Sequence, residues 1–562
     1  MTAALNILII GGYGIFGARL VELLENESRL TLLVGGRSAA KANGFIATRT
    51  AAKAHLLPAV FDRDGDVDTQ LAAIAPDIVV DASGPFQNYG DRPYRVVEAC
   101  LRRGINYLDL ADGSDFVAGI SAFDAKAREA GIFMLSGVSS FPVLTAAAVR
   151  KLSDDMSTVT AIHGGIAPSP FAVVGENVIR AIASYAGQPV QRIRNGAATA
   201  GYPFTEQLRY TVAPPGYVPL EPRLFSLVDV PDLRALAALW PQAKDIWMGA
   251  APVPQLLHRC LVALAWLVRW RLVSTLSPLA PLFHFCTNHV RWGQHRGGMF
   301  VEVAGVGAYG RPAKRSWHLL ADGDDGPYIP SMAVEAIMRN TLAGRAPSPG
   351  ASAALRDLEL DDYAKVFAGR TIYTGMRDDT ADQAKPLYQR LLSEAYADLP
   401  APIRAMHDLS ANAAAEGRTC VERGRNPLAR IAAACIGFPK ANPDTPVRVD
   451  FTVANGEETW RRTFGAESFA SRQFAGDGSS DGLLCEQFGP CRFGIALVIE
   501  GKRLVLVMRR WSVFGIPMPL WLCPHTQAYE SAEDGRFNFH VKISHPLTGL
   551  IVSYDGWLEP TS

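Results

Sequence analysis

Three glycines near the start of the chain, Gly12, Gly14 and Gly17, form a GxGxxG pattern directly after the apolar run Leu5–Ile10. In such a pattern the first glycine permits a tight turn, the second lets the backbone approach a pyrophosphate, and the third lets a helix pack closely on a strand. The helix expected from Phe16 onwards would direct its free N–H groups at the phosphates. We therefore expect the turn to bind a dinucleotide through Gly12, Tyr13, Gly14, Ile15, Phe16 and Gly17.

The end of the second expected strand, Leu30–Val34, indicates which dinucleotide is bound. An NAD site usually has Asp or Glu about 20 residues after the glycines, to hold the ribose 2′-hydroxyl. Here the strand runs into Gly-Gly followed by Arg37 and Ser38, without a carboxylate. Arg37 can form paired hydrogen bonds with a 2′-phosphate, and the Ser38 hydroxyl can bind it too. The sequence predicts NADP; the alternative is that Arg37 is a solvated charge and Ser38 only a helix cap.

A second loop follows the fourth expected strand and contains Ser83, Gly84, Pro85 and Phe86. Loops at the carboxyl ends of parallel strands line the ligand crevice of a doubly wound sheet. Ser83 and Gly84 offer close backbone approach to the cofactor, and Phe86 could flank the nicotinamide. The alternative is a plain Gly-Pro turn.

Three side chains on the same rim are candidates for a proton donor: Tyr89, Asp109 and Asp112. They could bind a polar substrate or protonate it, and the two carboxylates could equally cap the next helix. Their spacing does not select one of them. The sequence lacks an obvious Tyr-x-x-x-Lys pair, which disfavours the mechanism of short-chain dehydrogenases.

These motifs require a scaffold of alternating strands and helices. Such alternation over residues 1–150 predicts right-handed crossovers and a parallel Rossmann-type sheet covered on both faces. The expected strands are Asn6–Ile10, Leu30–Val34, His55–Phe61, Asp77–Asp81, Asn106–Leu110 and Ile132–Leu135. The fold class is therefore α/β.

Taken together, the motifs GGYGIFG, GGRS, VDASGPF followed by YG, NYLDLADG and SGVSSFP resemble the saccharopine-dehydrogenase-like NADP-binding family. The resemblance covers residues 5–150 well and extends loosely to about residue 370. It implies an NADP-dependent oxidoreductase with an inserted α+β domain, here residues 151–375, that covers the crevice with a mostly antiparallel sheet. The family includes amino-acid-forming and lipid-type reductases, so the substrate stays open. It often has Glu after the YxDL motif, where this sequence has Asp112.

The segment 246–301 contains no carboxylate but five arginines and four tryptophans around the apolar run Cys260–Val268. This run is much shorter than the ~20 residues that a membrane-spanning helix needs. Arginine and tryptophan beside a short apolar helix suit a helix lying in a membrane surface. A homodimer contact, a lid over an apolar substrate and internal packing are the alternatives. The spacing of His284, His289 and His295 does not match a metal site, and no metal is predicted.

Residues 386–562 form a separate β-rich domain, which polar residues 374–385 are expected to link to the rest. Alternating runs and turn residues predict a β-sandwich or a strongly curved sheet. The domain resembles an uncharacterised domain that commonly follows saccharopine-dehydrogenase-like domains, through WRRTF at 460–464, Glu486, FGP at 488–490 and GRFNF at 535–539. Several polar or amphipathic residues could point into a pocket or form surface pairs: Arg461, Arg462, Glu486, Arg510, Trp511 and His525. We interpret it as a ligand- or partner-binding module.

Composition limits the class of protein further. The 562 residues carry 55 basic and 55 acidic side chains, so a general electrostatic grip on nucleic acid is not expected. The eight cysteines are scattered without a CxxC pair, which is typical of a reduced cytoplasmic protein. The first residues lack a basic region, so we predict no signal peptide. The expected location is cytoplasmic, or peripheral at a membrane surface.

The expected function is hydride transfer between NADP(H) and an unidentified, lipid-like or polyketide substrate. The apolar segment 246–301 favours an amphiphilic substrate over a small amino acid. The alternative is a non-catalytic NADP-binding adaptor or lipid-surface protein whose C-terminal domain binds a ligand or partner.

Overall fold

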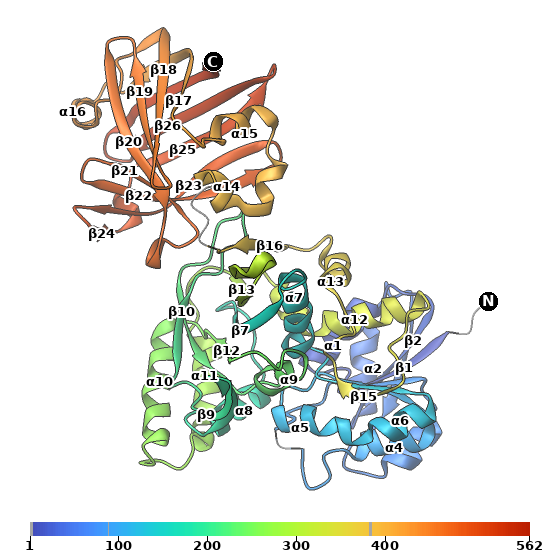
Figure 1. Ribbon diagram of the computed structural model, residues 1–562. Helices are drawn as coiled ribbons and strands as arrows, with labels where there is room; N and C mark the ends of the chain where they lie inside the picture. Colours follow the sequence, from blue (N-terminus) through green and yellow to red (C-terminus); the bar gives the residue numbers. More distant parts are fainter. Residues whose placement is uncertain (1–3, 88, 381–384, 562) are drawn as a thin grey trace. The chain divides into compact units, whose positions relative to one another are not determined.

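The computed structural model describes residues 4–87, 89–380 and 385–561 (Figure 1). The chain forms two compact units. The first consists of Met1–Arg209, Arg223–Lys314 and Leu320–Ile372, and the second of Tyr210–Pro222, Arg315–Leu319 and Tyr373–Ser562.

The first sheet is parallel, with the strand order β15-β6-β5-β4-β1-β2-β3. Its central strand β1 pairs with β2 on one side and β4 on the other, and its last four residues are buried. Apart from β15, the strands are β1 (Leu5–Ile10), β2 (Leu30–Gly36), β3 (His55–Val60), β4 (Ile78–Asp81), β5 (Asn106–Asp109) and β6 (Phe133–Ser136). The predicted Rossmann-type sheet is confirmed.

Helices cover this sheet on both faces (Figure 1). Their bounds are α1 (Ile15–Leu24), α2 (Ala39–Ala47), α3 (Val67–Ile74), α4 (Arg95–Arg103), α5 (Ser114–Gly119) and α6 (Asp124–Ala130). The strand β15 (Gly350–Ala353), far along the chain, pairs in parallel with β6 at the sheet edge. The segment 151–375 thus also supplies a strand to the first sheet.

The second sheet is mixed, with the order β10-β11-β12-β7-β13-β14-β16. Strand β7 pairs in parallel with β12 and antiparallel with β13. The strands are β7 (Thr158–Ala167), β10 (Gln207–Tyr210), β11 (Arg223–Leu227), β12 (Asp245–Ala250), β13 (Arg296–Val306), β14 (Pro312–Asp322) and β16 (Ile372–Asp378), and a hairpin β8 (Val190–Arg194) and β9 (Ala197–Gly201) lies apart. The helices of this part are α7 (Thr145–Leu152), α8 (Glu176–Tyr185), α9 (Asp232–Leu239), α12 (Ile329–Leu342) and α13 (Leu360–Phe367).

The carboxylate-free segment 246–301 contains the helices α10 (Gln255–Arg269) and α11 (Ala280–His289) between parts of β12 and β13. Large apolar side chains stay exposed on and around these helices: Leu256, Trp270, Leu272, Val273, Leu282, Phe285 and Trp292. Internal packing therefore accounts for only part of the segment, and the membrane-surface, dimer and lid alternatives stay predictions. No helix in the described part of the chain is long and apolar enough for a membrane crossing.

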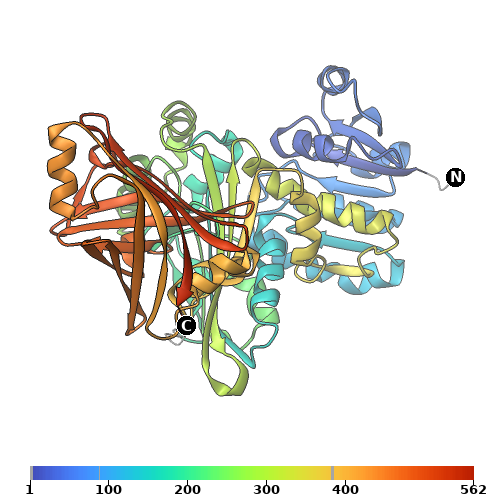
Figure 2. The same ribbon diagram turned by 90° about the horizontal axis from the view of Figure 1, so that it is seen from above.

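The C-terminal strands form one antiparallel sheet that closes on itself. Its order is β22-β21-β20-β19-β18-β17-β27-β26-β25-β23-β24, and β22 also pairs with β23. All strands but β24 thus make a closed barrel, coloured orange to red in Figures 1 and 2. The strands are β17 (Ala413–Arg423), β18 (Asn442–Ala454), β19 (Glu457–Phe464), β20 (Glu467–Ala475), β21 (Leu484–Phe488), β22 (Cys491–Glu500), β23 (Arg503–Val513), β24 (Ile516–Met518), β25 (His525–Glu533), β26 (Arg536–His545) and β27 (Gly549–Thr561).

The predicted separate β-rich domain is confirmed, with a correction to its form. It is not a sandwich: the strongly curved sheet closes into a barrel, because the β22–β23 ladder joins β22, at one end of the strand order, to β23 near the other end. Helices α14 (Leu387–Leu392) and α15 (Ala401–His407) add buried side chains to the barrel core, as does α16 (Pro427–Ile436). The predicted linker 374–385 is shorter than expected, because β16 extends to Asp378; residues 381–384 lie outside the described ranges.

Helix α1 approaches the first strand closely because position 17 is glycine. A Cβ atom placed there would lie 2.1 Å from the carbonyl oxygen of Gly11 and 2.8 Å from the Cα of Gly12. Both neighbours are backbone, so they cannot swing aside as a flexible side chain could. The third glycine of the motif thus sets the distance between the helix and the turn.

We predict that Gly17→Ala destabilises the first unit by about 1–3 kcal/mol, because overpacking forces the helix away from the turn. The same shift should weaken dinucleotide binding. Thermal unfolding and an NADPH titration measure the two effects. The matched control is Gly44→Ala in α2, where an added Cβ meets no atom within 4 Å. That change should stabilise the protein by roughly 0.5–1 kcal/mol, and equal behaviour of the two variants would contradict the packing argument.

Candidate functional site

A cleft of about 660 Å³ lies at the carboxyl ends of the strands of the first sheet. Residues of the glycine turn, the ends of β2 and β3, and the loop after β4 line it, together with Asp112 and Ser139 to Phe141. The start of α8 contributes Glu176, Asn177 and Val178. Backbone amides, two arginines (Arg37 and Arg63) and several carboxyl groups thus converge on one cleft.

The glycine turn forms a cradle for a phosphate group. Gly11 has a φ of +75°, which favours glycine, and the Gly14 N–H donates to its carbonyl oxygen over 2.8 Å. Gly14 is the N-cap residue of α1 and provides no side chain to cap the helix. The first N–H groups of α1 therefore stay available to an anion, where the helix dipole also favours negative charge.

The end of β2 presents one cation to the cleft. Arg37 is exposed, lines the cleft, and forms no hydrogen bond or ion pair with any residue in the described ranges. Ser38 is the N-cap of α2 and its hydroxyl accepts the Lys41 N–H over 3.3 Å. The Ser38 N–H donates to the Tyr13 hydroxyl over 3.1 Å, so Tyr13 fixes the turn beneath Arg37. Ser38 does cap the helix, while Arg37 stays free for a ligand.

Asp81, at the end of β4, organises the next loop. It is fully buried and accepts hydrogen bonds from the Ser83 N–H (3.0 Å), the Ser83 hydroxyl (2.7 Å) and the Tyr89 hydroxyl. Burial raises the pKa of Asp81, and these hydrogen bonds oppose the shift. The loop from 83 to 86 is thus held against the sheet by a carboxylate that the sequence analysis did not single out.

Tyr89 is enclosed and does not line the cleft. Its ring stacks on Phe86 with a centroid distance of 4.7 Å, and the Arg63 guanidinium lies 3.6 Å from its centroid. Burial and the neighbouring Asp81 raise the pKa of Tyr89 well above 10. Its hydroxyl is committed to Asp81, so Tyr89 holds the loop in place.

Asp109, at the end of β5, is also fully buried and away from the cleft. One carboxyl oxygen accepts the N–H groups of Ala111 (2.9 Å) and Gly137 (2.8 Å) and the Ser136 hydroxyl (3.0 Å). The other oxygen has no hydrogen-bond partner among the described residues. Burial raises the pKa of Asp109 to about 7. The side chain ties the ends of β5 and β6 together.

Asp112 differs from the other two candidates because it lines the cleft and stays partly exposed. Burial raises its pKa, and a hydrogen bond from the Gln87 side chain opposes that shift. A carboxyl group with a raised pKa at a ligand cleft is suited to hold and deliver a proton.

The structure brings most of the predicted cofactor residues to the cleft: Tyr13, Gly14, Ile15, Phe16, Arg37, Ser83, Gly84, Pro85 and Phe86. Gly12, Gly17 and Ser38 lie behind the lining and shape the turns. His163 lies elsewhere, with its Nε2 2.9 Å from a carboxyl oxygen of Asp245. Within the described ranges, no group of three or more His, Cys, Asp or Glu side chains could hold a metal ion.

Sequence reasoning missed two parts of the lining. Asp62, Arg63 and Asp64 follow β3 and line the cleft. They could have been identified as Ser83 was, because loops at the carboxyl ends of parallel strands line the ligand crevice. Glu176, Asn177 and Val178, at the start of α8, come from a distant segment. The Asn177 side-chain amide donates to the Gly84 carbonyl over 3.2 Å. No local sequence signal indicates that contact.

Two family models match the chain, one near its N-terminus and one near its C-terminus. Residues 7–135 match the saccharopine dehydrogenase NADP binding domain, and residues 399–558 match a domain of unknown function. The resemblance inferred from the motifs is therefore confirmed for the N-terminal and C-terminal domains. No curated protein matches the chain.

The solved structures that match the chain include dehydrogenases of low sequence identity. Apo saccharopine dehydrogenase (L-Glu forming) from Saccharomyces cerevisiae is 13% identical, with 66% of this chain and 100% of that chain covered and a TM-score of 0.46. The WlbA dehydrogenase from Thermus thermophilus, in complex with NAD and alpha-ketoglutarate, is 12% identical, with 65% and 93% covered and a TM-score of 0.28.

We predict that Asp109→Asn changes how stability depends on pH. The folded-state pKa of about 7 lies above the ~3.9 of an exposed aspartate. The folded protein therefore binds this proton more tightly, and the stabilisation present below about pH 4 is lost as the pH rises towards 7. Asparagine keeps the accepting oxygen and cannot ionise. Between pH 5 and pH 8 the variant should gain about 2–3 kcal/mol relative to the wild type.

Chemical unfolding at the two pH values measures this difference. The control is Asp361→Asn, at an exposed position in the same unit. Parallel pH profiles for the wild type and Asp109→Asn would show that the Asp109 carboxyl does not bind a proton more tightly in the folded state.

Proposed function

Because residues 7–135 form a dinucleotide-binding domain of the saccharopine dehydrogenase type, we propose that the chain is an NADP-dependent oxidoreductase. The observation that carries the cofactor preference is Arg37. It lies unpaired at the end of β2 and lines the cleft, in a turn with no carboxylate to repel a 2′-phosphate. When bound, NADPH supplies a hydride from its nicotinamide ring.

Each part of such a dinucleotide has residues of this chain that could bind it. The N–H groups at the start of α1 bind the pyrophosphate, and Arg37 binds the 2′-phosphate. The loop from 83 to 86, fixed by Asp81, lies at the ribose and nicotinamide end. Phe86 and Phe141 line this part of the cleft, and their apolar rings limit the access of water to the reacting carbon.

Asp112 is the proton donor that this arrangement favours. It lines the cleft, whereas Tyr89 and Asp109 are enclosed and committed to other groups. Its raised pKa keeps a larger fraction protonated near neutral pH than an exposed aspartate has. In the reducing direction, Asp112 would give its proton to the heteroatom or carbon that becomes electron-rich after hydride addition.

The substrate would be a molecule with a polarised double bond and an apolar body. Side chains that line the cleft beside the polar groups are largely apolar: Phe86, Leu110, Phe141, Ile166, Val178 and Ala181. They favour a lipid-like or polyketide carbonyl or enoyl compound over a small charged amino acid.

We predict that Arg37→Ala weakens NADPH binding by roughly 10- to 100-fold, because it removes charge-assisted hydrogen bonds of about 1.5–3 kcal/mol. NADH binding should stay the same, since NADH has no 2′-phosphate. Fluorescence titration of the purified chain with both nucleotides measures the effect. The control is Arg29→Ala, whose guanidinium is paired with Glu27 outside the cleft. Equal wild-type affinity for NADH and NADPH would contradict the NADP preference, and binding without turnover in a screen of carbonyl and enoyl compounds would favour the adaptor.

We predict that Asp112→Asn lowers kcat for a reducible substrate by roughly 100-fold or more. In the wild type, kcat for reduction should fall as the pH rises through the raised pKa of Asp112, because the donor is then ionised. The variant should lose this pH dependence and keep its affinity for NADPH. Steady-state rates across pH, with an NADPH titration as control, test this. A variant with the wild-type rate and pH profile would show that another group gives the proton.

A further inference from the structure

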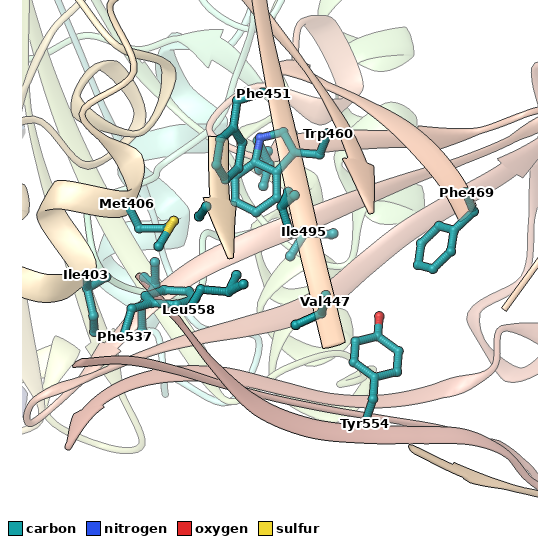
Figure 3. Close-up of a cluster of buried hydrophobic side chains, with 14 of the residues drawn as sticks. Ile403, Met406, Val447, Phe451, Trp460, Phe469, Ile495, Phe537, Tyr554 and Leu558 are labelled. Atoms are coloured by element: carbon teal, nitrogen blue, oxygen red, sulfur yellow. The ribbon is translucent and has the colours of Figure 1, made fainter. Parts of the chain in front are cut away.

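The barrel contains a cavity of about 220 Å³ inside the ring of strands. Most of its lining is apolar or aromatic and comes from nearly every strand, including Val447, Phe464, Phe488, Phe493, Ile495 and Phe539. Figure 3 shows Phe469 and Tyr554 pointing from different strands into the barrel interior. Cores normally pack without such voids, so a cavity of this size in an apolar interior indicates space for a ligand.

One wall of the cavity carries a cation that is already neutralised. Arg462 donates to the Glu486 carboxylate over 3.2 Å and to the Ser471 hydroxyl over 2.8 Å. The same carboxyl oxygen accepts from the Ser471 hydroxyl (2.7 Å) and the Gln473 amide (3.1 Å). The side chains of Arg462 and Glu486 are only 15% and 11% exposed.

A second polar pair lies on the side of the helices. Glu530 lines the cavity and is hydrogen bonded to Nε2 of His407 over 2.6 Å. The His407 ring stacks on Tyr388 with a centroid distance of 3.7 Å, and Tyr388 donates to Gln473. Arg462, Glu486 and Glu530 thus each have a partner within the barrel. His540, which also lines the cavity, is paired with Asp555. No counter-charge is therefore free among the described residues of the lining, and burying an additional charge there costs several kcal/mol.

The barrel opens between β23 and β25. These strands pair only at Leu504 with Glu530 and Val505 with Tyr529. Beyond that point a groove of about 530 Å³ lies between them. The groove and the interior cavity share several lining residues: Leu506, Met508, Pro524, Thr526, Ala528, Tyr529 and His540. The gap in the ladder is therefore a route from the surface to the cavity.

Large apolar side chains are exposed near this opening. Phe514 is 82% exposed and Trp521 is 74% exposed, and Ile516 and Leu520 lie in the same segment of the chain. Leu520 itself lines the groove. Exposed apolar groups of this size mark sites that meet an apolar partner or ligand.

We propose that the barrel binds a neutral single-chain lipid, with an alcohol, aldehyde or ketone as its polar group, that enters between β23 and β25. The interior cavity alone is smaller than the ~300–1,000 Å³ of usual small-molecule sites, and the groove provides the additional length for an elongated chain. The paired charges at Arg462 and Glu486 offer hydrogen bonds to a neutral oxygen and disfavour a free carboxylate. This proposal concerns the C-terminal domain and does not depend on the NADP site.

The test uses the full chain and two ligands of equal chain length, decan-1-ol and decanoate, in isothermal titration calorimetry at pH 8. We expect saturable one-to-one binding of decan-1-ol, at least tenfold tighter than that of decanoate. Binding of decanoate with equal or higher affinity would overturn the neutral head group. Absence of saturable binding of both would overturn the site.

A second test blocks the entrance between β23 and β25 with a larger side chain. Thr526 lines both the groove and the cavity, so Thr526→Phe should weaken decan-1-ol binding at least tenfold. The matched control is Thr452→Phe on β18, where the side chain is exposed and lines neither space. Ala528→Phe is the alternative plug if the first variant does not fold. NADPH titration and thermal unfolding of each variant separate loss of this site from failure of the N-terminal domain. A folded plugged variant that binds decan-1-ol like the wild type would overturn the entrance.

Discussion

Two buried carboxylates at the ends of neighbouring strands hold the functional rim together. Asp81 and Asp109 are register partners in the β4–β5 ladder, and both are fully buried. Each satisfies backbone and hydroxyl groups of a different loop, so their positions fix the loops after β4 and β6. Like charges so close together oppose ionisation, and Asp81 contributes to the raised pKa of Asp109. Burying these two side chains lowers the stability of the first sheet, but it holds the loops of the rim in place. Because Asp109 is enclosed in this way, Asp112 is the candidate carboxyl group that contacts the cleft.

The sequence allowed much of the first sheet to be predicted because its signals are local. Strands β1, β2 and β4 are mostly apolar runs that lead into turn residues. The rule that ligands bind after the carboxyl ends of parallel strands located the glycine turn, Arg37 and the loop from 83 to 86. The contacts of Asn177 with Gly84 and of β15 with β6 join residues that are far apart in the chain. The β15 sequence, Gly-Ala-Ser-Ala, has little strand propensity, and only its backbone hydrogen bonds with β6 make it a strand.

The closed barrel could be predicted only in part, for the same physical reason. Strands β18 and β26 alternate apolar and polar residues over much of their length, and β22 has a continuous apolar run, which are recognisable strand signals. By contrast, β17 and β25 contain Ala, Glu, Gly and Ser at many positions. Small residues disfavour an isolated strand, but β17 is bonded on both sides, by β18 and β27. Closure depends on the pairing of β22 with β23, which is a hairpin pair in sequence, together with long-range pairs such as β17 with β27. Periodicity along the chain carries no information about whether such a ring closes.

The cleft and the barrel differ in whether the charged groups of their lining already have a partner. In the cleft, the exposed Arg37 has no partner among the described residues, so its guanidinium is available to an anionic ligand. In the barrel, Arg462 and Glu486 already neutralise each other, which favours a neutral ligand. A ligand with a long apolar chain is scarce in water, because each buried methylene favours an apolar site by about 0.8 kcal/mol. Holding it on the same chain as the proposed hydride-transfer site would raise its effective concentration at that site. The two sites therefore need no direct contact for the barrel to influence what the cleft encounters.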